Sequence, residues 1–274
     1  MNSGKIAMGV LWASGLITLA ILVIVIGHIL LNGMGMISIE FLLDSPRALG
    51  REGGIFPTII GTIALVVVAL VIATPIGVGG AIYLAEYTHR GTITKIIRAG
   101  AECLAGIPSI LFGLFGFAFF VIFLGFGWSI LSGGLTVACM ILPMILRTTE
   151  EALKAVPNSY REGSLSLGAT KWQTIQNVVL KSAAAGIFTG IILGAGKVAG
   201  ETAAIMLTAG SALRLPTSLF DSVRPMSFHL YILAMEGLSM ERAYGTAAVL
   251  VLTVLFINLT ANLIMRYYTR ALRG

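Results

Sequence analysis

The chain has 274 residues, of which 57% are hydrophobic and only 11% are charged. Soluble domains carry about a quarter charged residues, so this composition all but excludes a water-soluble enzyme and indicates a membrane protein. The formal net charge of +6 is read as a topology signal and not as a nucleic-acid patch, so nucleic acid is not expected as a partner.

Six stretches of the chain have the roughly 20 mostly apolar residues that a membrane-spanning helix needs. The first exceeds the ~7–15 apolar residues of a secretory signal peptide and lacks a small-residue cleavage site, so we expect it to remain as a span. The sequence therefore predicts an all-α membrane protein with six transmembrane helices, forming one transmembrane domain over residues 1–274. The stretches run from about Ile6 to Leu31, Pro57 to Leu84, Cys103 to Phe126, Ile130 to Leu146, Ala183 to Leu207 and Ala243 to Met265.

The basic residues orient these spans. Twelve of the eighteen lysines and arginines fall on one set of connecting segments and five on the other, and Lys197 lies within a span. The face with more positive charge is normally cytoplasmic, so both termini are predicted in the cytoplasm of a multi-pass protein. On the opposite face, residues 33–56 form a mixed-charge connection, and a weakly amphipathic stretch covers about Leu215 to Leu238.

The segment of about residues 150–181 is too long for a simple turn between two spans. Loops beyond ~12–15 residues usually have structure or a function. We expect Pro157 to close a short helix and Asn158 or Ser159 to cap a second one, from Ser159 to Leu167. Gly168 should stop that helix in the left-handed conformation, and Thr170 should cap the next, which starts at Lys171.

This helix–turn–helix segment carries apolar side chains at Leu165, Leu167, Trp172 and Ile175. An ordinary cytoplasmic loop with positive charges would also fit the sequence. Exposed apolar side chains on a small helix are more typical of a surface that docks onto a partner, so docking is favoured.

The same segment resembles the EAA loop of ABC-importer permeases, in which Glu-Ala-Ala is followed by three residues, Gly, nine residues and Ile-x-Leu-Pro. Glu162, Gly168 and Leu180 match this pattern, whereas Gly163 and Ser164 replace the alanines and Lys181 replaces the proline. The resemblance implies a coupling helix that fits a groove on a separate ATP-hydrolysing subunit. The residues implied in that contact are Glu162, Gly163, Ser164, Leu165, Gly168 and Ala169.

Further stretches are similar to permeases of phosphate importers, and to the PstA type more than to its PstC-type partner. They are GGIFPTIIGT, IYLAEYT, AGIPSILFGLFGF, REGSLSLGATKW and GKVAGETAAIMLTA, beginning at Gly53, Ile82, Ala105, Arg161 and Gly196. The resemblance implies the MetI-like fold of type I ABC importers in the cell membrane. It also implies a heterodimer with a PstC-type permease, a PstB-type ATPase dimer and a PstS-type phosphate-binding protein.

Two charges interrupt the fifth predicted span. Lys197 and Glu201 are four residues apart and would share one face of a continuous helix. They could form a structural ion pair that fixes the helix register. Because Lys before Glu is the weaker order for such a pair, we favour a role in lining the translocation pathway, together with the adjacent Thr202. A lysine can donate a charged hydrogen bond to phosphate.

The same span carries Gly186, Gly190 and Gly194 at four-residue spacing. Small residues at this spacing let helices approach closely. General packing within the bundle is the more probable use, and packing against a partner permease is the alternative.

Motifs of catalysis are not found in the sequence. It lacks the G-x4-G-K-[ST] phosphate loop, so ATP hydrolysis is assigned to a partner subunit. His28, His89 and His229 are too scattered for a metal site, and we expect neither a metal nor a cofactor. The alternatives to a phosphate permease are a permease for molybdate or sulfate and, less favoured, an ion-coupled secondary transporter.

Overall fold

The computed structural model describes residues 2–88 and 91–271, so His89 and Arg90 lie outside it. The described part is helical apart from one small hairpin. Five helices are long and apolar enough to cross a membrane, and six crossings result if a bent pair of helices counts as one. The long helices are α1 (Asn2–Gly33), α3 (Phe56–Ile82), α6 (Ile130–Lys154), α9 (Leu180–Gly200) and α12 (Met240–Ala271).

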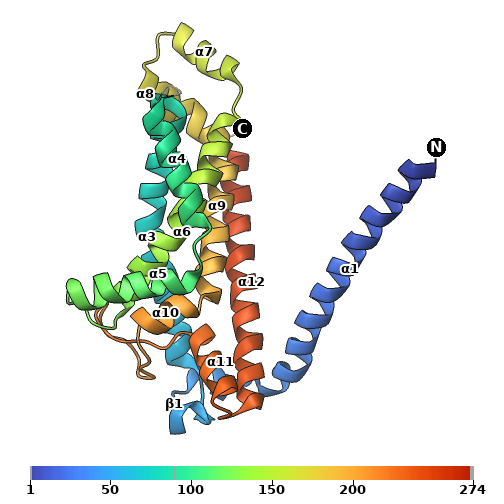
Figure 1. The fold of residues 1–274 in the computed structure, drawn as a ribbon, viewed down its shortest axis with the longest axis vertical. Helices are drawn as coiled ribbons and strands as arrows, with labels where there is room; N and C mark the ends of the chain where they lie inside the picture. Colours follow the sequence, from blue (N-terminus) through green and yellow to red (C-terminus); the bar gives the residue numbers. More distant parts are fainter. Residues whose placement is uncertain (1, 89–90, 272–274) are drawn as a thin grey trace.

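The core lies where α3, α6 and α9 pack together, with α12 against α9 (Figure 1). Its most buried residues include Leu65 of α3, Val137 and Ile141 of α6, and Val198 of α9. In contrast, α1 projects away from the bundle and meets α12 only near its C-terminal end (Figure 1). The start of α1, the end of α12 and the short helix α7 (Asn158–Ser166) lie at the same end of the molecule, called here the α7 end.

The third predicted span is not one straight helix. It consists of α4 (Thr92–Ala105), which packs against α6, and of α5 (Ser109–Gly116) with the π-helical η4 (Phe117–Phe123), which turn away by 101°. The break falls at Pro108, which has no N–H to continue the helix and disfavours helical backbone at the residue before it. The expectation of a single run from Cys103 to Phe126 was therefore wrong in its start and in its continuity.

The helix at the fifth predicted span begins earlier and ends earlier than the sequence predicted. It starts with α8 (Lys171–Thr174), passes through the π-helical η5 (Ile175–Val179) and ends with α9 at Gly200. Glu201 has extended backbone, with φ −72° and ψ 133°, and the separate helix α10 (Ala203–Thr208) follows. The expectation of one helix from Ala183 to Leu207 was wrong because the chain turns at Glu201.

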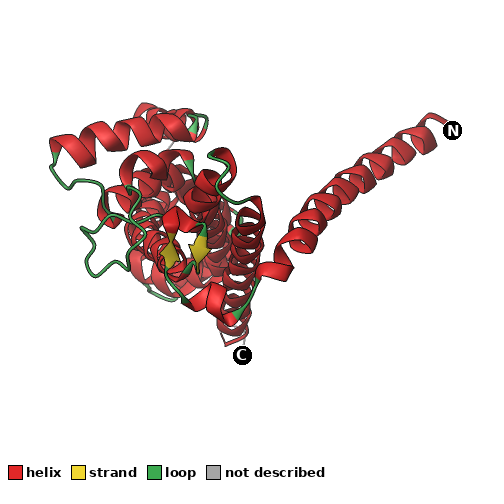
Figure 2. Cartoon of the chain, turned by 90° about the horizontal axis from the view of Figure 1, so that it is seen from below, coloured by secondary structure: helices red, strands yellow, loops and turns green. Residues whose placement is uncertain are grey.

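The opposite end of the bundle, called the hairpin end, holds the short elements between α1 and α3. They are η1 (Met34–Met36), α2 (Ile39–Leu43), β1 (Pro46–Arg47), η2 (Ala48–Gly50) and β2 (Glu52–Gly53). The two strands pair antiparallel, with Arg47 opposite Glu52, and Figure 2 shows them beneath the helices. Near them lies α11 (Met226–Met235), within the stretch predicted as amphipathic.

Candidate functional site

The segment between α6 and α9 forms a helical hairpin, as predicted. Helix α7 ends at Ser166, and Gly168 adopts the left-handed conformation with φ +84°. The backbone N–H of Gly168 donates to the carbonyl of Leu165 at 2.9 Å, which closes the helix end. Thr170 then caps α8 through a reciprocal pair of hydrogen bonds with Gln173, of 3.3 and 2.8 Å.

Two local expectations at this segment were wrong. The residue that caps α7 is Pro157, without a side-chain hydrogen bond, and neither Asn158 nor Ser159 serves as the cap. The helix that ends before Pro157 is not a separate short one, because α6 continues from the membrane to Lys154. The last turns of α6 therefore extend from the core to the start of the hairpin.

The hairpin, defined here as residues 158–174, presents apolar side chains to its surroundings. None of the nine residues of α7 is buried. Leu167 is 91% exposed, and Leu165, Trp172 and Tyr160 are each about half exposed. Ile175, predicted as part of this surface, is instead buried and anchors η5 to the bundle. An exposed apolar cluster on a projecting element is typical of a docking surface.

One guanidinium attaches α7 to the rest of the molecule. Arg161 donates from Nε to both carboxylate oxygens of Glu86 at 3.2 Å, and from Nη2 to Glu86 Oε1 at 2.6 Å. It also donates to the carbonyl of Leu153, in the last turn of α6, at 2.9 Å. A further bond of 2.7 Å goes to the carbonyl of Val156, just after α6 ends. Arg161 thus joins three elements: α7, α6 and the π-helical η3 (Tyr83–Tyr87) that ends α3.

Two weaker contacts hold the second half of the hairpin. The hydroxyls of Ser164 and Thr174 are 2.9 Å apart, which links α7 to α8. The ammonium of Lys171 lies 4.9 Å from the centroid of the Tyr87 ring, a cation–π distance. The end of α3 therefore contacts both helices of the hairpin, through Glu86 and Tyr87.

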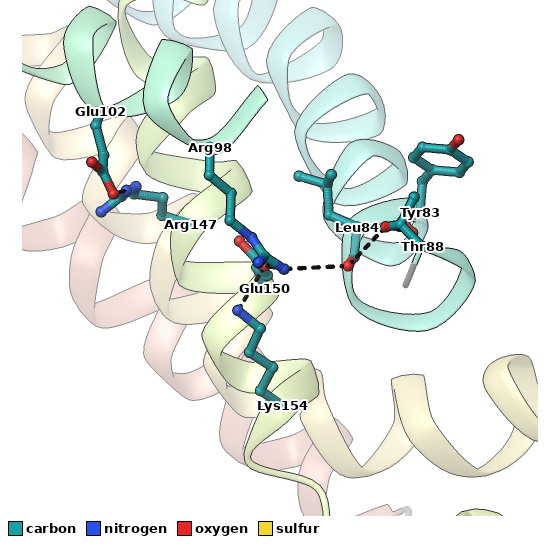
Figure 3. A network of polar contacts seen from close by, with 8 residues as sticks. All are labelled: Tyr83, Leu84, Thr88, Arg98, Glu102, Arg147, Glu150 and Lys154. Carbon is teal, nitrogen blue, oxygen red and sulfur yellow. Dashed lines mark hydrogen bonds and ion pairs between the residues drawn. The ribbon is translucent and has the colours of Figure 1, made fainter. Parts of the chain in front are cut away.

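A network of ion pairs ties the neighbouring helices together at the α7 end (Figure 3). The carboxylate of Glu150, whose side chain is 7% exposed, accepts from Arg98 of α4 at 2.6 Å and from Lys154 at 2.7 Å. Arg147 of α6 pairs with Glu102 of α4. Sequence reasoning assigned these basic residues to topology alone and missed their partners, because Arg98 and Glu150 are separated by 52 positions.

The structure separates Lys197 from Glu201. Lys197 lies exposed in the last turn of α9, whereas Glu201 follows the helix end. The Glu201 carboxylate accepts from the backbone N–H of Ala204 at 3.1 Å, so it caps α10, and its carbonyl accepts from the Ser227 hydroxyl at 2.6 Å. Within residues 2–88 and 91–271, the ion pairs do not include Lys197 with Glu201. The expectation that they share a helix face was wrong.

Lys197 belongs to a continuous exposed stripe of α9, defined here by its exposed residues at three- or four-residue spacing. The stripe comprises Ser182, Ala185, Thr189, Leu193, Lys197 and Gly200. At the α7 end it opens into a cavity of about 570 Å³, whose lining includes Lys181, Asn177 and Tyr160. Thr202, the third residue predicted for the pathway, is half-buried at the start of α10. The stripe is a small-residue and polar surface that this chain leaves uncovered.

The glycines of α9 lie on a different face. A Cβ on Gly186 would overlap Ala152, and a Cβ on Gly190 would overlap the Thr148 hydroxyl, both on α6. Gly194 faces Ile141 and Ile145 of the same helix. These glycines therefore allow α9 to pack closely against α6 of the same chain. This agrees with the favoured interpretation of general packing within the bundle.

Comparison with known proteins decides the family. Residues 77–274 match the family described as "Binding-protein-dependent transport system inner membrane component". The chain belongs to this family. It is accordingly a multi-pass inner-membrane permease component of an ABC transporter and not itself the ATPase.

Relatives match over most of the chain. The probable ABC transporter permease protein YqgI of Bacillus subtilis is 34% identical, over 94% of this chain and 93% of that protein. The phosphate transport system permease protein PstA of Pasteurella multocida is 34% identical, over 85% and 83%. The PstA of Haemophilus influenzae is 30% identical, over 96% and 94%.

Solved structures show the same fold. An inward-facing structure of the MetNI methionine ABC transporter has a TM-score of 0.63 at 18% identity, covering 77% of this chain and 94% of that one. A bacterial alginate ABC transporter with its periplasmic protein has a TM-score of 0.66 at 16% identity, covering 97% of both chains. The all-helical, MetI-like fold predicted from the sequence is confirmed.

Proposed function

We propose that this chain is the PstA-type permease subunit of an ABC importer for inorganic phosphate. The observation that carries the proposal is the match to relatives named as phosphate permeases, at 30–34% identity over 85–96% of this chain. The exposed Lys197, placed on the uncovered stripe of α9, agrees with an anionic substrate.

In this proposal the chain forms half of the pathway with a PstC-type permease. A PstB-type ATPase dimer binds at the α7 end, and a PstS-type binding protein delivers phosphate at the hairpin end. The α7 end and both termini are then cytoplasmic, which agrees with the excess of basic residues predicted there. Residues 1–274 act as a single transmembrane domain.

Coupling is assigned to the hairpin. Its exposed apolar side chains at Leu165 and Leu167 would enter a groove of the ATPase, beside Glu162, Gly163 and Ser164 and the turn at Gly168 and Ala169. Closure of the ATPase pair around ATP moves the hairpin, and the bundle changes between inward-open and outward-open states.

Translocation is assigned to the exposed stripe of α9. Lys197 offers a mobile charged donor to a phosphate oxygen, and Thr202 adds a hydroxyl near the same end. Glu201 acts by holding the turn between α9 and α10, because its carboxylate is engaged with the Ala204 N–H at 3.1 Å. The permease needs little affinity of its own, since tight binding would slow release.

Uptake of labelled phosphate into proteoliposomes that contain the four kinds of subunit tests the substrate. Uptake should require ATP and binding protein, and an excess of molybdate or sulfate should leave it unchanged. Preferential transport of either competitor would favour a permease for another oxyanion. Ion-driven flux without the ATPase would favour a secondary transporter.

Copurification tests the docking surface separately. Leu167→Asp should abolish recovery of the ATPase with this chain, because it places a charge in an apolar contact. The melting temperature should not change, since Leu167 is 91% exposed. The matched control is Leu49→Asp, because Leu49 is exposed at the other end of the bundle, between β1 and β2. This variant should retain the ATPase. Leu31→Asp would not be a suitable control, because Leu31 lies in a span.

A further inference from the structure

The coupling hairpin has little packing to carry a force into the bundle. None of the residues of α7 is buried. A helix without buried side chains can rotate or slide on its support unless directional bonds hold it. The bonds of Arg161 to Glu86 and to the end of α6 are directional, and they join α7 to two helices of the core at once.

The environment of this pair makes it stiff. The side chain of Glu86 is 7% exposed and that of Arg161 is 19% exposed. An arginine that donates two hydrogen bonds to one carboxylate fixes orientation as well as distance, which a lysine cannot do. The carbonyls of the last turn of α6 lack intrahelical donors, so a cation there is also favourable.

We infer that Arg161 and Glu86 are positioning residues that transmit movement of the coupling hairpin to the cytoplasmic end of α3. The inference rests on the proposed function, because it presumes that an ATPase moves the hairpin. A displacement of α7 pulls Arg161, which draws the carboxylate of Glu86 and with it the π-helical turn Tyr83–Tyr87. Because α3 packs against α6 and α9 in the core, a shift of this turn is passed on to α9, which carries the proposed pathway.

The test uses the assembled transporter in lipid nanodiscs, with Glu86→Gln and Arg161→Lys as variants. The readouts are ATPase copurification, basal ATP hydrolysis, and hydrolysis stimulated by the loaded binding protein. We expect both variants to retain the ATPase subunit and the basal rate of hydrolysis. The stimulation of hydrolysis by the loaded binding protein should fall about tenfold, which is within the range of allosteric couplings. In proteoliposomes, the amount of phosphate moved per ATP should fall as well.

Glu151→Gln is the matched control, because it removes an exposed carboxylate from the same end of α6. It should leave all three readouts unchanged. A merely structural role would lower copurification and basal hydrolysis together with stimulation, and that result would overturn the inference. Unchanged stimulation in Glu86→Gln and Arg161→Lys would overturn it too. If the unaltered chain recovers no ATPase, the proposed function fails instead.

Discussion

Gly190 of α9 lies directly against Thr148 of α6, so closely that a Cβ on the glycine would overlap the threonine hydroxyl. The Thr148 hydroxyl is itself engaged with the carbonyl of Met144 on its own helix, at 2.9 Å. Two helices of the core are thereby held at short range by the absence of a side chain. This contact turns the glycine face of α9 towards α6 and leaves the neighbouring stripe of α9 exposed.

A larger residue at this contact should destabilise the bundle. Gly190→Leu inserts a side chain into a closed interface, and overpacking of this kind costs about 1–3 kcal/mol. The melting temperature in detergent should fall measurably. Gly15→Leu on α1, where nothing lies within 4 Å of the added Cβ, should leave it unchanged. Equal melting temperatures for the two variants would contradict the packing described.

The turn at Gly168 should need a glycine because of its backbone conformation, and not because neighbouring atoms leave no room for a side chain. Its φ is +84°, yet nothing lies within 4 Å of an added Cβ. Gly168→Val therefore introduces strain of about 1–2 kcal/mol, which the hairpin relieves by changing its turn. Copurification of the ATPase should decrease while the melting temperature stays the same. Gly100→Val, an uncrowded helical glycine of α4, should retain the ATPase.

Lys197 and Glu201 should respond differently to substitution, because Lys197 is exposed on α9 whereas the Glu201 carboxylate is hydrogen-bonded to the Ala204 N–H. Lys197→Met should reduce phosphate uptake and leave assembly intact, whereas Lys95→Met, at an exposed site on α4, should not affect uptake. Full uptake by Lys197→Met would remove this residue from the pathway.

Substitutions of Glu201 test its hydrogen bond to the Ala204 N–H, which the structure shows in place of a structural ion pair with Lys197. Glu201→Ala removes the acceptor for the Ala204 N–H and should cost about 0.5–2 kcal/mol of stability. Glu201→Gln keeps an acceptor oxygen and should be close to the unaltered protein in melting temperature. A stability loss in both variants alike would show that the charge of Glu201, and not its capping bond, matters for stability.

His229 of α11 should make stability depend on pH. Burial, together with the positive charges of Arg224 and Arg242, lowers its pKa to about 4. The unfolded chain, with a histidine pKa of about 6.5, binds the proton first as the pH falls. The stabilisation is therefore complete above pH ~6.5 and is lost towards pH ~4, at about 1.4 kcal/mol per pH unit.

Thermal melting at a series of pH values measures this dependence. The difference in stability between the unaltered chain and His229→Leu should change across the window from pH ~6.5 to ~4 and be constant above it. Carboxylates that titrate in the same window contribute equally to both proteins and cancel in the difference. A pH-independent difference would show that His229 is not buried in the neutral form.

Hydropathy and local turn chemistry were sufficient for much of the architecture. Long apolar runs predicted the spans, and Gly168 with Thr170 predicted the helical hairpin, because a left-handed glycine and a capping hydroxyl act through neighbouring residues. Hydropathy predicted one continuous span across the bend at Pro108, because the apolar run continues through it and hydropathy does not report direction.

The residues that act across the sequence could not be found in this way. Spacing suggested that Glu201 belongs to the helix of Lys197. Instead, Glu201 has extended backbone, its carboxylate accepts from the Ala204 N–H, and its carbonyl accepts from the Ser227 hydroxyl. Arg161 and Glu86 lie 75 positions apart, and the sequence contains no sign that they meet. Such pairs follow from the tertiary fold.

The separation of α1 from the other helices has a consequence for how the protein is made. None of its apolar window is buried, and the interior of a helix pairs its own backbone groups, as lipid requires. It can therefore span the bilayer without support from the core of the chain, before the helices that follow it have packed together. Exchanges among its apolar residues should therefore change the packing within this chain less than exchanges in α3, α6 and α9, which form the core.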